Sequence, residues 1–362
     1  MPTTLPDLSV DPVAIHDLAE EIIAGRTQCT AEQARQLIRV APGSAAAEAL
    51  FAGAQALRTA HVGIKLKCCS IINVKAGNCS ENCSYCAQSH ESTFDGYDKT
   101  KWMDGEDIAA ATGSAAGNGA QAISLVAAWK GVKEGKQLDM VCKTIEDFAK
   151  TSPIRADVNL GILESQVCAD RIAQAGAKVY GHNLETAPSH FDSICSTHSF
   201  AERMKTIRFI KNAGMGLCSG GIVGMGESLD QRVEFMESLR LIEPDMIPIN
   251  FLNPIAGTGL GHLAKLDPDE ALISLAVFRW MLPDRNLMIA GGKEVVLGDR
   301  LHEVFRTGIN SVMVGNYLTT MGTSPTYWQD AAAKYGLEFS TAAAESERPS
   351  SGCGKPGGCG RR

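Results

Sequence analysis

The chain has 362 residues, of which 44% are hydrophobic, and its formal net charge is −7. This length suits two average domains or one large α/β barrel with extensions, and the hydrophobic content is ample for a sizeable core. No apolar run reaches the ~20 residues that a membrane helix needs. The modest acidity argues against a nucleic-acid partner.

Cysteine usage indicates the compartment. Twelve cysteines in 362 residues are far fewer than a disulfide scaffold carries. The N-terminal segment MPTT begins without an apolar signal peptide. We therefore expect a cytoplasmic protein, in which cysteines act more often as metal ligands than as disulfide bridges.

Residues 1–62 predict a helical extension. From Asp11 to Ala24 the apolar residues recur at helical spacing. Thr30 and Gln33 have the spacing of a capping box at the start of a second helix. The alanine-rich segment 45–60 predicts a third helix.

From residue 63 to residue 336, short apolar runs alternate with amphipathic segments. The expected strands are 69–74, 122–127, 157–160, 178–180, 216–219, 246–251, 287–290 and 311–314. The expected helices between them are 107–116, 140–150, 165–174, 201–212, 231–241, 268–281 and 300–306. This α/β alternation favours a closed (β/α)8 TIM-type barrel, with a doubly wound open sheet as the alternative.

A cysteine motif follows the first expected strand. Cys79, Cys83 and Cys86 form C-x3-C-x2-C, and three thiolates on one loop can hold a 4Fe–4S cluster that keeps one iron open for a ligand. A Cys3His zinc site completed by His90 is the alternative. The position after a strand places this loop at the C-terminal mouth of a barrel, where barrel enzymes keep their chemistry. The spacing resembles that of radical S-adenosylmethionine enzymes, in which the open iron binds S-adenosylmethionine and the reduced cluster cleaves it to a 5′-deoxyadenosyl radical.

The C-terminal segment 337–362 has the composition of a flexible tail. Cys353 and Cys359 lie within it between glycines, which let a backbone wrap closely around an object. Most of the remaining cysteines are expected to pack as small buried residues; they are Cys29, Cys68, Cys142, Cys168 and Cys195, the last in a polar loop.

Beyond the cysteines, segments from about residue 15 to residue 325 resemble the biotin synthase family. They are IINVKAG at 71–77, CAQS at 86–89, AAW at 127–129, YGHNLET at 180–186, CSGGIVGMGE at 218–227 and IPINF at 247–251. The resemblance implies radical insertion of sulfur into dethiobiotin, with sulfur from a second, sacrificial iron–sulfur cluster. It also implies a flavodoxin or ferredoxin as reductant and a homodimer.

The resemblance also assigns binding roles. Tyr85 would contact the adenine of S-adenosylmethionine, and Glu185 its ribose. Arg203 would bind its carboxylate, and the segment Ala127, Ala128 and Trp129 its amino group. Gly220 and Gly221 would let the backbone approach it closely. Asn183 and Asn250 would hold the ureido ring of dethiobiotin, since an amide offers both a donor and an acceptor. Thr319 and Thr320 would bind the substrate carboxylate.

The chain departs from the family at the auxiliary cluster. The family's three cysteines and one arginine correspond to Ser124, Asp157, Cys218 and Met288, so only Cys218 is kept. Neighbours on a strand face opposite ways, and we expect Cys69 to point into the barrel and Cys68 to point outward. We therefore hypothesise an auxiliary four-iron cluster with an added sulfide, ligated by Cys69, Cys218, Cys353 and Cys359. The alternative is a tail whose cysteines bind adventitious metal.

Two other functions stay open at this point. One is a related radical enzyme acting on another small molecule, such as a hydrogenase-cofactor maturase. The other is a non-enzymatic iron–sulfur carrier or scaffold. The pair Asn183 and Asn250 favours biotin synthesis, because a ureido ring needs such partners.

Overall fold

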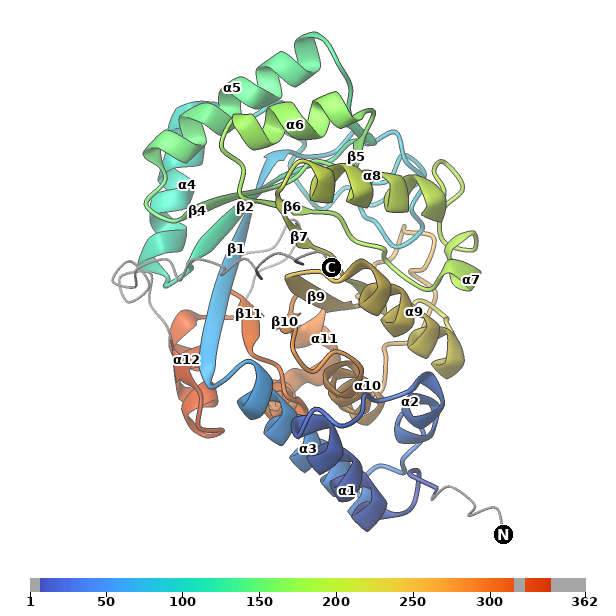
Figure 1. The fold of residues 1–362 in the computed structure, drawn as a ribbon. Helices are drawn as coiled ribbons and strands as arrows, with labels where there is room; N and C mark the ends of the chain where they lie inside the picture. The colour runs from blue at the N-terminus through green and yellow to red at the C-terminus, as the bar shows by residue number, and fades with distance from the viewer. Residues whose placement is uncertain (1–6, 316–322, 340–362) are drawn as a thin grey trace, which may run out of the picture.

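The computed structural model describes residues 7–315 and 323–339. Eight parallel strands form a barrel (Figure 1). They are β1 (Lys65–Lys75), β2 (Ala122–Ala127), β4 (Arg155–Asn159), β6 (Val179–Gly181), β7 (Gly216–Cys218), β9 (Met246–Phe251), β10 (Asn286–Ile289) and β11 (Ser311–Met313). Their order is β10-β11-β1-β2-β4-β6-β7-β9, and β9 pairs again with β10 to close the cylinder. The prediction of a closed (β/α)8 barrel is confirmed, and the open-sheet alternative is wrong.

Helices surround the strands. They are α4 (Gly105–Gly117), α5 (Lys136–Thr151), α6 (Gln166–Gln174), α7 (Pro188–Phe191), α8 (Phe200–Asn212), α9 (Leu229–Ile242), α10 (Pro268–Met281), α11 (Lys293–Leu297) and α12 (Pro325–Ala333). The segment expected as an α-helix at 300–306 is instead part of a 3-10 helix, η1 (Gly298–Thr307), that follows α11 directly. Gly298, the first residue of η1, has a positive φ of 50°, which interrupts the α-helical path.

Short strands extend the barrel. β8 (Gly221–Val223) pairs with β9, and β3 (Gly131–Val132) pairs with β5 (Ile162–Leu163). The strand β12 (Glu338–Phe339) pairs with the first residues of β1. This pairing lengthens β1 beyond the expected segment 69–74 and carries the described fold past the expected boundary at residue 336.

The N-terminal helices pack beside the barrel. α1 (Pro12–Ile23), α2 (Ala31–Leu37) and α3 (Ala45–His61) lie together next to α9 and α10 (Figure 1). The predicted capping box is confirmed, because Thr30 and Gln33 each bond the other's backbone N–H. The indole of Trp280 on α10 donates to the carbonyl of Leu50 at 3.0 Å. α10 is therefore covered both by the barrel and by α3, which explains its run of buried residues from Ala271 to Met281.

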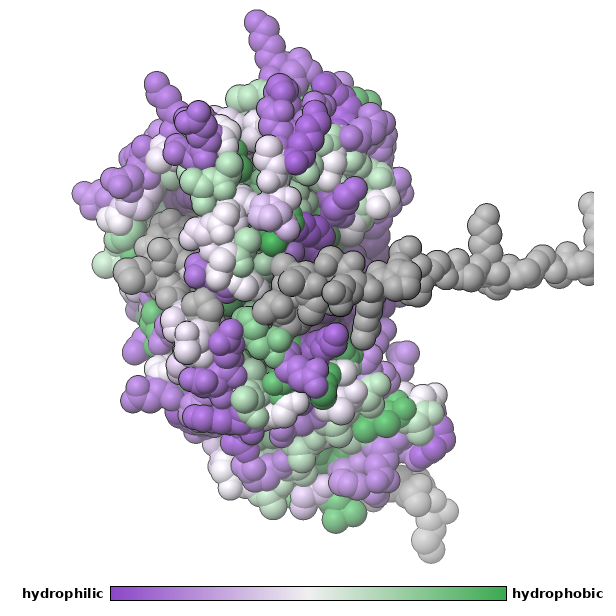
Figure 2. Space-filling view, turned by 90° about the vertical axis from the view of Figure 1, so that its left-hand side faces the viewer, coloured by the Kyte–Doolittle hydropathy of each residue, from purple (hydrophilic) through white to green (hydrophobic). Residues whose placement is uncertain are grey.

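The side chains of Cys68 and Cys69 on β1 point to opposite faces of the strand, as predicted. Cys68 is fully buried in the core between strands and helices, and Cys69 lines the cavity inside the barrel. None of the helices in the described residues is both long and apolar enough to cross a membrane. The face in Figure 2 carries mainly hydrophilic side chains over the outer helices, with small separate apolar patches.

Candidate functional site

The three-cysteine loop begins where β1 ends, at the C-terminal mouth of the barrel. Cys79, Cys83 and Cys86 all line one small cavity of about 230 Å³. The Cys86 N–H donates to the Cys83 carbonyl at 3.0 Å, and Gly77 N–H donates to the buried Gln88 side chain at 2.8 Å. These local bonds hold the cysteines on a compact turn that faces the cavity. Burial raises the pKa of Cys86 to about 11, so iron binding must displace protons.

His90, the fourth ligand of the zinc alternative, lies elsewhere. It is exposed, and its ring lies 3.9 Å from Glu91. The buried donor atoms that cluster in the described residues are instead those of Cys83, Cys195 and His198. The geometry thus gives no support to a Cys3His site made with His90.

Most of the residues expected to hold S-adenosylmethionine share the small cavity. Tyr85, Ala127, Ala128, Trp129, Glu185 and Arg203 line it together with the cysteines. Arg203 is 8% exposed and donates to the Asn183 carbonyl at 2.8 Å, with Glu185 Oε1 at 3.5 Å. A buried cation beside a carboxylate suits a ligand that carries both a carboxylate and hydroxyl groups.

His182 is a site residue that sequence reasoning missed. Its ring is buried and lines the small cavity, and its Nε2 atom has no hydrogen-bond partner within the described structure. Burial, and then the charge of Arg203, hold the pKa of His182 well below its ordinary value. A neutral, unpartnered acceptor at a cavity wall fits a bound ligand that donates hydrogen bonds. Its position in the YGHNLET segment is the only sequence signal for it.

Gly220 and Gly221 permit a close approach inside the protein. A Cβ atom at Gly220 would lie 1.9 Å from the Pro248 carbonyl oxygen, and one at Gly221 would lie 2.1 Å from the Glu185 carbonyl oxygen. Neither glycine is among the residues that line the small cavity. They hold β8 against β9 and against Glu185, and their contact with S-adenosylmethionine stays a prediction.

We expect Gly220→Ala to lower the free energy of unfolding by about 1–3 kcal/mol, because the added methyl forces the backbones of residues 220 and 248 apart. Urea unfolding of the purified variant measures this loss. Gly117→Ala is the matched control, since nothing lies within 4 Å of a Cβ atom there. Equal stability of Gly220→Ala and wild type would contradict the close approach.

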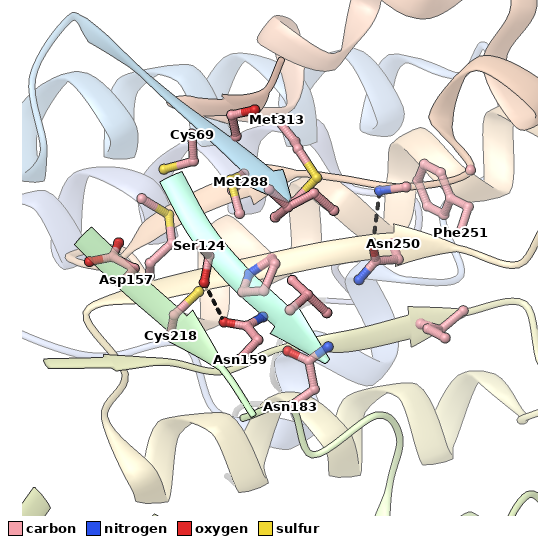
Figure 3. A pocket seen from close by; sticks show the side chains of 18 of the residues that line it. Cys69, Ser124, Asp157, Asn159, Asn183, Cys218, Asn250, Phe251, Met288 and Met313 are labelled. Atoms are coloured by element: carbon pink, nitrogen blue, oxygen red, sulfur yellow. Dashed lines mark hydrogen bonds between the residues drawn. The ribbon is translucent and has the colours of Figure 1, made fainter. Parts of the chain in front are cut away.

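A larger cavity of about 560 Å³ occupies the barrel. Cys69 and Cys218 line it toward one end, whereas Asn183 and Asn250 lie toward the end to which the strands point (Figure 3). Two of the four predicted ligands of the auxiliary cluster and two of the four predicted substrate residues are thus in one chamber. Thr319, Thr320, Cys353 and Cys359 lie outside the described residues.

Polar pairs occupy two of the three positions where we predict that the family's auxiliary ligands are missing, and Met288 occupies the third. Asp157 pairs with Arg155 through contacts of 2.8 and 2.9 Å, and Ser124 Oγ donates to Asn159 Oδ1 at 2.8 Å (Figure 3). Burial raises the pKa of Asp157, and Arg155 opposes that rise. Arg155 lines the same cavity as Cys69 and Cys218, and no sequence motif marks it.

The comparisons with known proteins agree with this geometry. Residues 74–239 match the Radical SAM superfamily, and residues 248–338 match the Biotin and Thiamin Synthesis associated domain. A biotin synthase from Anaeromyxobacter sp. (strain K) is 40% identical over 315 residues, which are 86% of each chain. Another from Geobacter sulfurreducens is 39% identical, covering 86% of this chain and 94% of the relative.

Solved structures show the same fold at lower identity. Methylornithine synthase gives a TM-score of 0.77 at 17% identity, covering 91% of this chain and 99% of that chain. The FeFe-hydrogenase maturase from Carboxydothermus hydrogenoformans gives a TM-score of 0.72 at 15% identity, covering 91% of this chain and 80% of that chain. At such identities the likeness concerns the fold alone, whereas the match to the biotin synthases is both close and nearly complete. The chain is therefore a member of the biotin synthase family of radical S-adenosylmethionine enzymes.

Proposed function

We propose that this enzyme inserts sulfur into dethiobiotin to form biotin. The observation that carries the proposal is that its two cavities adjoin, since Tyr85, Cys86, Gln88 and Val126 line both. A radical produced beside the cysteine loop can therefore reach a substrate in the barrel without crossing bulk water. Such exclusion of water is what a protein must supply when a cofactor carries the reactive chemistry.

The small cavity suits S-adenosylmethionine by charge and by hydrogen bonding. Arg203 offers a cation for the carboxylate, Glu185 accepts from ribose hydroxyls, and His182 Nε2 accepts a further hydrogen bond. When bound, a four-iron cluster on the three loop cysteines supplies the electron that cleaves S-adenosylmethionine to the 5′-deoxyadenosyl radical.

Asn250 is prepared to bind a ureido ring. Its Oδ1 accepts from Gly291 N–H at 2.9 Å, and its Nδ2 donates to the Gly221 carbonyl at 3.0 Å. The first bond uses one of the two lone pairs of Oδ1, and the second uses one of the two N–H groups of Nδ2. One lone pair and one N–H are therefore left for a ligand, in a fixed orientation. Asn183 is held in the same way, by Gly220 N–H at 3.1 Å and Glu185 at 3.3 Å.

We expect Asn250→Ala to raise the KM for dethiobiotin about 10–100-fold, because each lost hydrogen bond costs roughly 1–3 kcal/mol. The measurement is 5′-deoxyadenosine formation as dethiobiotin is titrated. Asn212→Ala, at the exposed end of α8, is the control that should leave the KM unchanged. A wild-type KM in a folded Asn250→Ala variant would remove this residue from the substrate site.

We also propose that the sulfur comes from an auxiliary four-iron cluster on Cys69 and Cys218, completed by Cys353 and Cys359. Two observations support this. Cys69 on β1 and Cys218 on β7 line one cavity (Figure 3), and Arg155 places positive charge near both sulfurs. Thiolate-ligated clusters are anionic, so a neighbouring guanidinium stabilises them. The added sulfide, the tail ligands and a carboxylate site at Thr319 and Thr320 stay predictions.

The test is an oxygen-free incubation with S-adenosylmethionine, reductant and dethiobiotin, with biotin measured by mass spectrometry. Biotin formation supports the proposal. 5′-Deoxyadenosine without biotin would instead indicate another small-molecule substrate, such as that of a hydrogenase-cofactor maturase. Absence of 5′-deoxyadenosine would point to the carrier role, which family membership already disfavours. The flavodoxin or ferredoxin reductant, the homodimer and the cytoplasmic location stay predictions.

A further inference from the structure

A third asparagine side chain lines the larger cavity, beside the two that are expected to bind the ureido ring. Asn159 is the last residue of β4. Its Oδ1 accepts from the Ser124 hydroxyl at 2.8 Å. Within the ranges 7–315 and 323–339, no residue accepts a hydrogen bond from its Nδ2. The N–H groups of this amide are therefore open to a ligand in the cavity.

Gly181 on β6 supplies the space for this amide. A Cβ atom at Gly181 would lie 1.8 Å from Asn159 Oδ1 and 2.5 Å from Asn159 Nδ2. On its other side, Gly181 pairs in register with Cys218 on β7. The amide of Asn159 thus lies across β6 at the level of Cys218, and Figure 3 draws it between Cys218 and Asn183. It occupies the part of the chamber where a predicted cluster ligand and a predicted substrate residue come together.

The ureido ring of dethiobiotin leaves no polar group for Asn159. The ring has two N–H donors and one carbonyl oxygen with two lone pairs. Asn183 and Asn250 each keep one lone pair and one N–H for a ligand, so together they match every polar group of the ring. The carboxylate of the substrate is at the far end of an alkyl chain. Asn159 therefore needs a different acceptor.

The acceptor expected at this level of the barrel is sulfur. Cys69 and Cys218 would hold the proposed auxiliary cluster, whose sulfur atoms carry negative charge. A hydrogen bond to an anionic acceptor is stronger than one between neutral groups. Asp157 holds the guanidinium of Arg155 at one side of this level. Asn159 lies two residues further along β4, toward the substrate residues, and its N–H groups are not engaged.

We propose that the Asn159 amide donates a hydrogen bond to a sulfide of the auxiliary cluster, on the side that faces the substrate. Such a bond stabilises the negative charge on sulfur and raises the reduction potential of the cluster. Asn159 is a positioning residue for that sulfide, and Ser124 fixes the orientation of its amide. The inference rests on the auxiliary cluster of the proposed function and adds the residue that orients its sulfur.

The test compares Asn159→Leu and Ser124→Ala with wild type in the full-length, cluster-loaded enzyme. Leucine has the branched shape of asparagine but no donor, whereas Ser124→Ala keeps the amide and removes its anchor. The midpoint potential of the auxiliary cluster is measured by redox titration of the electron paramagnetic resonance signal that does not change when S-adenosylmethionine is added. Iron per chain and the KM for dethiobiotin are measured on the same samples. Asn212→Leu, at the exposed end of α8, is the matched control.

With unchanged iron content, we expect a more negative auxiliary potential in Asn159→Leu and a smaller shift in the same direction in Ser124→Ala. The signal that responds to S-adenosylmethionine should keep its potential in both variants, and Asn212→Leu should match wild type. The KM for dethiobiotin should stay at the wild-type value, in contrast to that of Asn250→Ala.

An unaltered auxiliary potential in a loaded Asn159→Leu would overturn the inference. A raised KM with an unaltered potential would also overturn it, because Asn159 would then be a substrate residue. If Asn159→Leu does not retain the cluster, the presence or absence of the shift in Ser124→Ala decides. Failure of the proposed function is distinguishable, because wild type itself would then hold only about four iron atoms per chain and show no second signal.

Discussion

Cys86→Ala is expected to reduce the reductive cleavage of S-adenosylmethionine to background, a fall of more than ~1000-fold, because no side chain can replace a redox cofactor. Cys86 is the loop cysteine that lines both cavities, so its loss removes a ligand at the point where they meet. The measurement is 5′-deoxyadenosine released per chain in the presence of a strong reductant.

Cys86 gives a cleaner test than Cys83, because Cys195 lies 3.8 Å from Cys83 and offers a substitute thiol. Cys168→Ala is the control, since Cys168 is a buried cysteine on α6 outside both cavities. It should keep wild-type cleavage. Substantial 5′-deoxyadenosine from Cys86→Ala would rule out the three-cysteine cluster as the source of the radical.

Cys218→Ala is expected to separate the two halves of the reaction. Biotin formation should fall to background, whereas cleavage of S-adenosylmethionine should continue, because Cys218 lines only the larger cavity. Iron should drop from about eight to about four atoms per chain if a whole four-iron cluster is lost. Biotin, 5′-deoxyadenosine and iron are measured on the same preparation.

Truncation after Arg348 addresses the other two ligands of the hypothesis, since it removes Cys353 and Cys359. The same loss of iron and of biotin is expected as for Cys218→Ala. Full iron content and biotin formation in the truncated chain would exclude the tail cysteines as ligands. If Cys218→Ala also kept both, the auxiliary site would have to be sought elsewhere in the chain.

The shared cavity of the three loop cysteines and the inward direction of Cys69 were predicted from local pattern. The three loop cysteines are close in sequence, so their spacing alone sets their proximity. The assignment of Cys69 to the barrel interior followed from the alternation of side chains along a strand. In both cases the prediction depends only on residues that are close together in the sequence.

The residues that sequence reasoning missed depend on distant contacts. Cys195 was interpreted as a packing residue, yet it lies against Cys83, 112 positions away. Arg155 carried no motif, and its place beside Cys69 and Cys218 arises only when β1, β4 and β7 meet in one barrel. His182 looked like part of a family segment, and only its buried, unpartnered Nε2 indicates a ligand contact.

The sequence by itself determined the eight strands, the helical extension and the loop that can hold a cluster, because hydrophobic periodicity and short spacings encode local structure. The tertiary structure alone decided which side chains share each cavity and that the two cavities adjoin at Tyr85 and Cys86. It also placed the sulfur of Cys195 3.8 Å from the sulfur of Cys83. Closure of the barrel is the physical reason, because it brings together residues that no local pattern relates.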